Sequence, residues 1–382
     1  MEKEILKLEK VTVKPEEEMI TVTMPLSSYK AFNCMIDYPI VGWHDRDETA
    51  MARADWNHDM YPLPECYKRR NDVPRGKMFG RLMEDSLFYP GVKHKYWVYV
   101  PAQYNGKDPA DLILFLDGQF NFGRLITDEE FLKSTGRKTM SDMLKVVPVY
   151  DDMVLPEAEE GNVTDMLDNL IADGVIPPTI GLFVAPGYPG PGEPVYGTGK
   201  GVTNRSVEYD TVSDWYARFI KEELMPEALK GLKITASPKG HSTVGISSGG
   251  IAGFNLAWYD NDIFGNAIIG SPSFGNIRGG NIWPSVIRTT DEKKDLRTCM
   301  CVGKYDADII FGDWILADKD VASALNYKGY DFRLIINEMG HSMHFLKRMI
   351  PEALRWLYHG EEIVEEKCEV IKPYPLVTSL DK

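Results

Sequence analysis

Residues 241–257 read HSTVGISSGGIAGFNLA, a short apolar stretch followed by a glycine-rich turn and a second apolar stretch. The turn, GISSGG at residues 245–250, has the Gly-x-Ser-x-Gly form of a nucleophile elbow with Ser247 at its apex. In such an elbow the serine occupies a strained turn between a strand and a helix, so its neighbours must be small. Residues 241–246 are typical of a buried strand, and the apolar residues from Ile251 onward are typical of a packed helix. The segment therefore predicts a strand, a serine turn and a helix.

Apolar runs recur along the rest of the chain at the spacing of an α/β protein. They lie at residues 96–100, 112–116, 180–184, 267–269, 299–302 and 332–336. Between them we expect helices, the clearest at residues 211–229, with Asp210 or Thr211 as its cap, and at residues 344–358. The alternation predicts a mostly parallel central sheet flanked by helices.

The chain of 382 residues is long enough for one large domain with added segments. We expect residues 73–366 to form that domain, after an N-terminal extension at residues 1–72 and before a C-terminal tail at residues 367–382. The best strand candidate in the extension is residues 19–25. The acidic segment at residues 127–162 interrupts the alternation of strands and helices and is expected to form a lid.

Charge and cysteine content narrow the classes of partner. With 43 basic and 57 acidic residues the chain carries a net charge of -14, which disfavours nucleic acid as a partner. The five cysteines lack a CxxC spacing, so neither a disulfide framework nor a zinc site is expected. The sequence shows no signal-peptide core and no apolar stretch of bilayer length, so we expect a soluble, cytoplasmic protein that does not bind a membrane.

A serine hydroxyl is a poor nucleophile near neutral pH, so Ser247 requires a histidine to take its proton and an acid to orient that histidine. In serine hydrolases of the α/β type, the acid and then the histidine follow the serine on loops after late strands. His341, in the segment NEMGHSMH after residues 332–336, fits this order best, and His344 is its rival. A metal site at these two histidines is disfavoured, because no third ligand is apparent.

Candidates for the acid lie in the segment KYDADIIFGDW, which follows residues 299–302. We expect Asp306 to take this role, with Asp308 as the second candidate and Asp313 as the third. The alternative for each is a solvated loop acid or a helix cap.

The tetrahedral intermediate of acyl transfer needs donors for its oxyanion. The N–H group of Ser248, directly after the nucleophile, is expected to supply the first. We expect the second from Gln119, in the segment LILFLDGQF, where a strand runs into a glycine turn. Taken alone, this segment fits a simple strand-ending turn as well.

Ten segments taken together resemble one branch of a known superfamily. They are VPRGKMFG, FYPGVKHKYWVYVPAQY, LILFLDGQF, IPPTIGLFVAPG, NRSVEYD, VGISSGGIAGFNLAW, GSPSF, VGKYDAD, MGHSMH and PEALRWLY. Over residues 73–358 the chain resembles the esterase branch of the α/β-hydrolases, the group of enterochelin esterases, feruloyl esterases and esterase D. The resemblance implies an α/β-hydrolase fold and a serine carboxylesterase without metal or organic cofactor, with Ser247, His341 and Asp306 as its catalytic triad. It also implies Gln119 as the second oxyanion donor.

Two further features bear on the substrate. Within NRSVEYD, Arg205 and Glu208 are expected to pair as a structural clamp just before a helix. In the alternative, Arg205 faces the substrate and would favour a carboxylate or a catecholate. Met339 stands where relatives often carry glycine, which leaves the range of substrates open.

These features predict hydrolysis of a carboxylic ester. The substrate classes are a phenolic (feruloyl-type) ester linked to plant cell-wall sugar, a catecholate siderophore triester, or a small ester metabolite. An acyltransferase of the same fold and a non-catalytic binding protein with an esterase fold are the alternatives. We expect the N-terminal extension, with Trp43, Trp56 and Tyr61 as apolar anchors, to pack on its own domain, and a homo-oligomer formed through it is the alternative.

Overall fold

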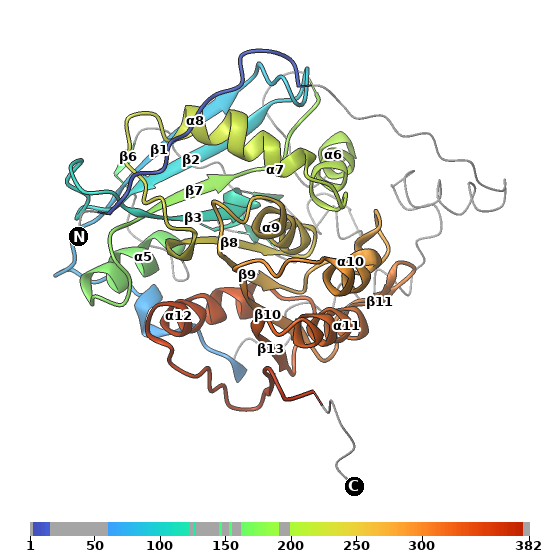
Figure 1. The fold of residues 1–382 in the computed structure, drawn as a ribbon. Helices are drawn as coiled ribbons and strands as arrows, with labels where there is room; N and C mark the ends of the chain where they lie inside the picture. Colours follow the sequence, from blue (N-terminus) through green and yellow to red (C-terminus); the bar gives the residue numbers. More distant parts are fainter. Residues whose placement is uncertain are drawn as a thin grey trace, which may run out of the picture.

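The computed structural model describes residues 3–15, 60–121, 125–126, 145–146, 153–154, 162–190 and 199–376. Within these ranges ten strands form one sheet in the order β14-β13-β10-β9-β8-β3-β7-β2-β1-β6 (Figure 1). Neighbours from β13 to β7 in this order are parallel, and the strands at both margins are antiparallel. Their bounds are β1 Lys77–Met83, β2 His94–Val100, β3 Asp111–Leu116, β6 Met153–Val154, β7 Thr179–Val184, β8 His241–Ile246, β9 Asn266–Gly270, β10 Arg297–Gly303, β13 Asp331–Asn337 and β14 Glu369–Ile371. Two short hairpins pair β4 Leu125–Ile126 with β5 Lys145–Val146, and β11 Asp308–Ile309 with β12 Gly312–Asp313.

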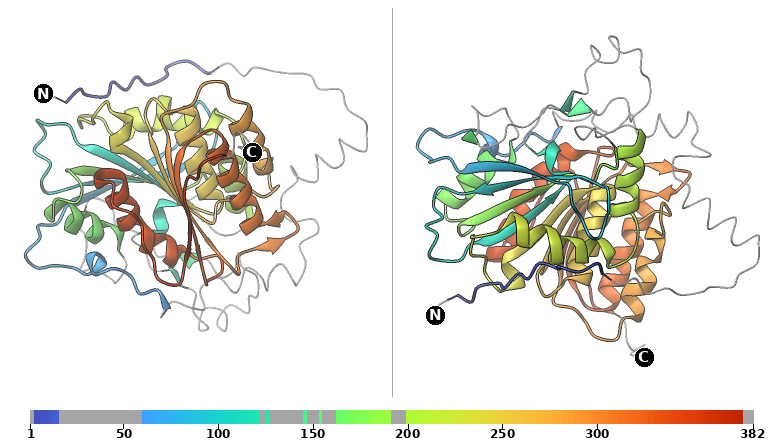
Figure 2. Two further views of the ribbon diagram at one scale, coloured as in Figure 1. Left: turned by 60° about the horizontal axis from the view of Figure 1, so that its bottom comes forward. Right: turned by 90° about the horizontal axis from the view of Figure 1, so that it is seen from above.

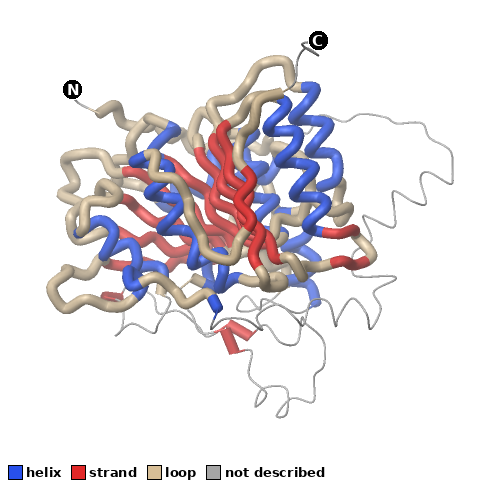
Figure 3. The backbone as a smooth tube through the Cα atoms, turned by 90° about the horizontal axis from the view of Figure 1, so that it is seen from below, coloured by secondary structure: helices blue, strands red, loops and turns tan. Residues whose placement is uncertain are grey.

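Helices cover both faces of the twisted layer of strands (Figure 3). The α-helices are α5 Val163–Ala172, α6 Gly199–Tyr209, α7 Trp215–Phe219, α8 Met225–Ala228, α9 Ser248–Tyr259, α10 Trp283–Thr289, α11 Trp314–Tyr327 and α12 Met343–His359. A π-helical turn, η4 Ile220–Leu224, joins α7 to α8, and the 3-10 turns are η2 Glu65–Tyr67, η3 Gly118–Phe120, η5 Pro238–Gly240 and η6 Gly280–Ile282.

Each face of the sheet has its own apolar core. On β3, Leu112, Leu114 and Leu116 belong to one core and Ile113 and Phe115 to the other, as the alternation of side chains along a strand requires. Helices α6 to α11 contribute to the first core, and α5 and α12 to the second. The predicted fold class, a mostly parallel sheet flanked by helices, is confirmed.

The helix expected at residues 211–229 begins later than predicted. It starts at Trp215, after Asp214 at its N-cap position, so neither Asp210 nor Thr211 caps it. The Thr211 hydroxyl instead donates a hydrogen bond to the carbonyl of Val207, at 2.6 Å, and so caps the end of α6. A threonine hydroxyl just after a helix can bond the carbonyl four residues before it, and Thr211 makes this bond instead of capping the next helix.

Two described parts of the N-terminal extension lie against the domain. Residues 3–15 run along the outside of the domain (Figure 2) and contact η4 and α8: the N–H group of Val11 donates to the carbonyl of Glu222 at 2.9 Å, and Lys10 binds Glu227 at 2.9 Å. Tyr61 and Tyr67, in the second part, are buried in the core that α5 and α12 share. The strand candidate at residues 19–25 and most of the expected lid lie outside the described residues.

At the other end of the chain, β14 adds a strand to the sheet from within the expected C-terminal tail. In the described ranges, no helix combines the length and the apolar character needed to span a lipid bilayer.

Candidate active site

Ser247 lies at the carboxyl end of β8 with a backbone conformation that non-glycine residues rarely adopt. Its φ is 59° and its ψ is -124°, and α9 begins at the next residue. The N–H group of Ser247 donates to the carbonyl of Gly270 at 2.9 Å, and its carbonyl accepts from the N–H group of Ser273 at 3.0 Å. The strained turn is thus held on both sides, as a nucleophile elbow requires.

The glycines around Ser247 are sterically required. A Cβ atom on Gly245 would collide with the carbonyl oxygen of Gly249, and one on Gly249 would lie 2.7 Å from a carboxylate oxygen of Asp117. On Gly250 it would lie 2.9 Å from the Cα atom of Pro272. Larger residues at these three positions would separate the strand, the helix and the neighbouring loops.

His341 and Asp306 are hydrogen-bonded to each other, at 2.8 Å between Nδ1 and Oδ1. Asp306 follows β10, and His341 lies in the loop between β13 and α12. Since a carboxylate can only accept, the ring carries its hydrogen on Nδ1, and Nε2 is left as the basic nitrogen. The ring edge also contacts Trp314, with the ring centroids 6.3 Å apart.

Asp306 has a full set of hydrogen-bond donors in addition to His341. Its carboxylate accepts from the Ser271 hydroxyl at 2.5 Å, from the Gly303 N–H group at 3.2 Å and from the Ala307 N–H group at 2.7 Å. Burial would raise the pKa of Asp306, but His341 and the hydrogen bonds outweigh it, so the pKa lies below its ordinary value. Asp306 is therefore held as an anion beside the histidine.

The rival residues lie elsewhere. Asp308 is exposed on β11, and Asp313 caps α11 by accepting from the N–H group of Leu316 at 3.0 Å. His344 donates from Nε2 to the carbonyl of Tyr61 at 2.7 Å. Among the described residues, no three His, Cys, Asp or Glu side chains form a cluster that could hold a metal ion.

Ser247 and the His341–Asp306 pair share the carboxyl edge of the sheet. Their strands belong to the consecutive series β13, β10, β9 and β8, and each residue comes within four positions of its strand's end. The structure shows no hydrogen bond between Ser247 and His341, and the Ser247 hydroxyl lies 3.5 Å from that of Ser273. Catalytic hydrogen bonds of this kind are often long before substrate binds.

Ser248 and Gln119 lie on the elements predicted for oxyanion donors. Ser248 is the first residue of α9, where the N–H groups have no partner within the helix. Gln119 lies in η3, directly after β3, and β3 pairs with β8. Asp117 takes a left-handed conformation with φ 49°, which turns the chain into η3. The Gln119 side chain is 2% exposed, and neither of its amide atoms has a hydrogen-bond partner.

The predicted pair of Arg205 and Glu208 is wrong, because the two side chains do not bind each other. Both lie within α6 and not before a helix, and each reaches a different neighbour. Arg205 binds Asp117 through two hydrogen bonds, from Nε at 2.8 Å and from Nη2 at 2.7 Å. Glu208 binds His94 at 2.9 Å and accepts from the Gly187 N–H group at 2.8 Å. Asp117 and Glu208 are both buried carboxylates, and each is satisfied by its own partners instead of by a shared one.

Residues 157–319 match the family model described as Putative esterase. The predicted resemblance to the esterases is confirmed. A search of curated proteins found no match to the chain.

Solved esterase structures share the fold. A ferulic acid esterase has 15% identity and a TM-score of 0.50, with 75% of this chain and 99% of that one covered. The ferulic acid esterase of Anaeromyces mucronatus has 12% identity, a TM-score of 0.53 and coverage of 77% and 95%. The enterobactin esterase of Shigella flexneri has 13% identity and a TM-score of 0.53, with 78% of this chain covered. The chain spans 63% of that enterobactin esterase.

Ser271 and Trp314 are parts of this candidate site that the sequence analysis did not single out. Ser271 binds Asp306, and the Trp314 indole N–H group donates to the carbonyl of Ser271 at 3.1 Å. The available signal was the position of Ser271, directly after β9 at the same sheet edge as Ser247. Met339, the departure from the family pattern, has its buried side chain in the core shared by α5 and α12.

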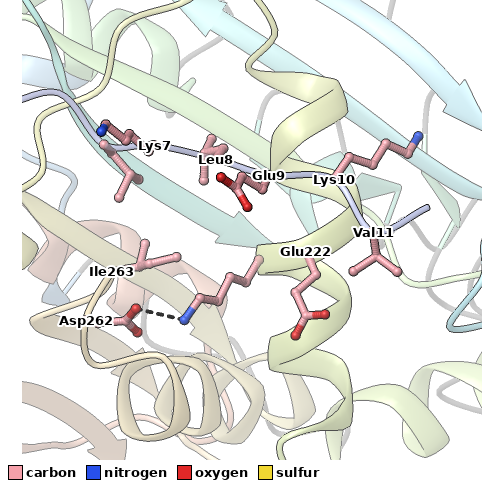
Figure 4. Close-up of a pocket in the computed structure, with 10 residues that line it drawn as sticks. Lys7, Leu8, Glu9, Lys10, Val11, Glu222, Asp262 and Ile263 are labelled. Atoms are coloured by element: carbon pink, nitrogen blue, oxygen red, sulfur yellow. Dashed lines mark hydrogen bonds and ion pairs between the residues drawn. The ribbon is translucent and has the colours of Figure 1, made fainter. Parts of the chain in front are cut away.

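A surface groove lies apart from these residues (Figure 4). It separates the N-terminal segment from the domain, and a hydrogen bond of 2.8 Å joins Lys221 to Asp262 beside it. Its lining consists of Leu6, Lys7, Leu8, Glu9, Lys10, Val11, Lys221, Glu222, Asp262 and Ile263. No residue of the candidate active site lines this groove.

Proposed function

We propose that the chain is a serine carboxylesterase, with Ser247 as nucleophile, His341 as general base and Asp306 as the acid that orients it. The observation that carries the proposal is the strained elbow at Ser247 on the same sheet edge as a buried, hydrogen-bonded His341–Asp306 pair. The match of residues 157–319 to an esterase family model supports it.

The reaction follows from these roles. His341 Nε2 takes the proton of Ser247 as Oγ attacks the ester carbonyl, and the N–H groups of Ser248 and Gln119 stabilise the oxyanion. The intermediate expels the alcohol, which takes the proton from His341, and leaves an acyl-serine. Water then gives a proton to His341 as its oxygen attacks the acyl group, and the second intermediate collapses as Ser247 Oγ leaves and takes that proton from His341, which releases the carboxylic acid and restores both residues.

For the substrate, we propose an ester of the phenolic (feruloyl) or siderophore type, supported by the similarity to ferulic acid and enterobactin esterases. The two hydrogen bonds between Arg205 and Asp117 support the structural role of Arg205 and do not favour an anionic substrate. A panel of feruloyl, siderophore and acetyl-sugar esters tests this proposal by kcat/KM, and product analysis with an added alcohol distinguishes hydrolysis from acyl transfer.

Substitution of Ser247 tests the mechanism directly. Ser247→Ala is expected to lower kcat on a short p-nitrophenyl ester by roughly a thousandfold or more and to abolish labelling by a fluorophosphonate probe. Ser273→Ala is a close control, because its hydroxyl lies 3.5 Å from that of Ser247, and it should keep the label. Full turnover by Ser247→Ala refutes the proposal.

The same assay separates the two acids. Asp306→Asn is expected to lower kcat by roughly a hundred- to ten-thousandfold, because His341 loses the carboxylate that sets its tautomer. Asp308→Asn, two residues away and exposed, should stay near the parent activity.

A further inference from the structure

One residue of the N-terminal extension, Tyr61, binds the chain on both sides of His341, in its loop and at the start of α12. Three residues before His341, the N–H group of Glu338 donates to the Tyr61 hydroxyl at 3.1 Å. Three residues after it, His344 donates from Nε2 to the Tyr61 carbonyl at 2.7 Å. The sequence separation is 277 residues for the first contact and 283 for the second.

Tyr61 is itself held firmly in place. It is 1% exposed, and its hydroxyl donates to the carbonyl of Lys367 at 3.1 Å. Its ring meets the ring of Phe345 edge-on, with centroids 4.9 Å apart. Burial raises the pKa of Tyr61 to about 12, so the hydroxyl remains a donor to Lys367 while it accepts from Glu338.

The opposite side of the loop is bound to the segment that carries the acid. The N–H group of Tyr305, next to Asp306, donates to the carbonyl of Met339 at 3.0 Å. The acid's segment therefore binds the loop at Met339, and Tyr61 binds the chain at Glu338 and at His344. A shift of about 1 Å in a catalytic group can cost a hundredfold in rate, so the support of this loop bears on catalysis.

We propose that Tyr61 is a positioning residue for His341, and that the N-terminal extension thereby helps to set the geometry of the active site. The inference rests on the proposed function, because His341 acts as the base only there. Tyr61 acts through the loop and does not touch the reacting atoms.

Tyr61→Phe tests the proposal, because it keeps the ring and removes only the hydroxyl that binds Glu338 and Lys367. The expected result is a fall in kcat of roughly tenfold, slower fluorophosphonate labelling of Ser247 and little change in KM. Tyr67→Phe is the matched control: Tyr67 is a buried tyrosine of the same extension, and its hydroxyl donates to the carbonyl of Lys347 on α12 at 2.6 Å. Tyr67→Phe should lose stability but keep the parent kcat.

Thermal midpoints of both variants separate positioning from simple destabilisation. The inference is overturned if Tyr61→Phe keeps the parent kcat and labelling rate, or if both variants lose kcat equally at equal loss of stability. Such a result, with Ser247→Ala inactive, leaves the esterase proposal intact. Activity in Ser247→Ala refutes the proposed function itself, whatever the effect at Tyr61.

Discussion

At the scale of single residues, Asp306 and Asp318 are two buried carboxyl groups with opposite surroundings. Asp306 accepts hydrogen bonds from His341, Ser271 and two backbone N–H groups. Asp318, on α11, is fully buried, and neither of its oxygens has a hydrogen-bond partner. Burial, and then the negative charge of Asp306 and Asp313, holds the pKa of Asp318 well above its ordinary value. The surroundings of Asp318 thus favour the neutral acid, and those of Asp306 favour the anion.

Asp318→Asn is expected to stabilise the protein increasingly as pH rises. The pKa of Asp318 is higher in the folded than in the unfolded chain, so above the unfolded value the native state binds the extra proton. Stability therefore falls with rising pH in this window, by about 1.4 kcal/mol per pH unit from this group, until the folded pKa is reached. An asparagine does not titrate and removes that loss.

Urea unfolding of Asp318→Asn and the parent protein, over pH values from the ordinary carboxyl pKa upward, measures this difference. A difference in free energy that stays constant with pH would show that Asp318 is ionised in the folded protein.

The choice of acid shows the limit of sequence reasoning at this scale. Order along the chain places Asp306 and Asp308 in one loop after β10 and does not separate them. Their environments do, because Asp306 meets donors from two distant segments, at Ser271 and His341, while Asp308 is exposed on a hairpin. The hydroxyl of Ser271, 35 residues from Asp306, could not be assigned to it from sequence order.

At the scale of elements, the elbow depends on the close approach of β8 and α9. Gly245→Ala is expected to destabilise the protein by roughly 1–3 kcal/mol and to lower activity, because the added methyl group meets the backbone of Gly249. Gly253→Ala, within α9, is expected to cost less stability. Its added methyl group meets side-chain atoms of Ile269 and Thr243 at 3.3 Å, and these side chains can adjust. Chemical unfolding of both variants checks the prediction, and equal losses would contradict it.

Elements marked by a run of apolar residues could be predicted from the sequence, and elements that bury charged residues were harder to predict. Strands β3 and β7 have every residue buried, and five of the six residues of each are apolar or glycine. Helix α5 was not predicted, because it buries Asp165 and Asp168 on an inward face. Those acids lie near Arg69, at 3.9 and 3.8 Å, and Asp168 accepts from the Tyr99 hydroxyl at 2.6 Å. Only the tertiary structure provides these partners.

At the scale of the whole molecule, the two described parts of the extension bind opposite ends of the sheet. Residues 3–15 bind at the amino edge, where Ile5 pairs with Thr235 and Ile234 pairs with Ala110, the residue before β3. Tyr61 binds at the carboxyl edge, beside the loop of His341. The sequence placed both in one extension and could not separate their roles, since each depends on contacts across the whole chain.

Removal of residues 1–15 is therefore expected to lower stability and to spare hydrolysis. The six residues of β3 separate the amino edge from the carboxyl edge by roughly 20 Å, too far for a direct effect on Ser247. The loss of Leu6 and Leu8, both partly buried, should cost roughly 1–3 kcal/mol. Removal of residues 1–72 takes Tyr61 and Tyr67 as well, and should abolish hydrolysis. Thermal midpoints and ester turnover of the two truncations check this contrast, and an inactive but stable protein lacking residues 1–15 would contradict it.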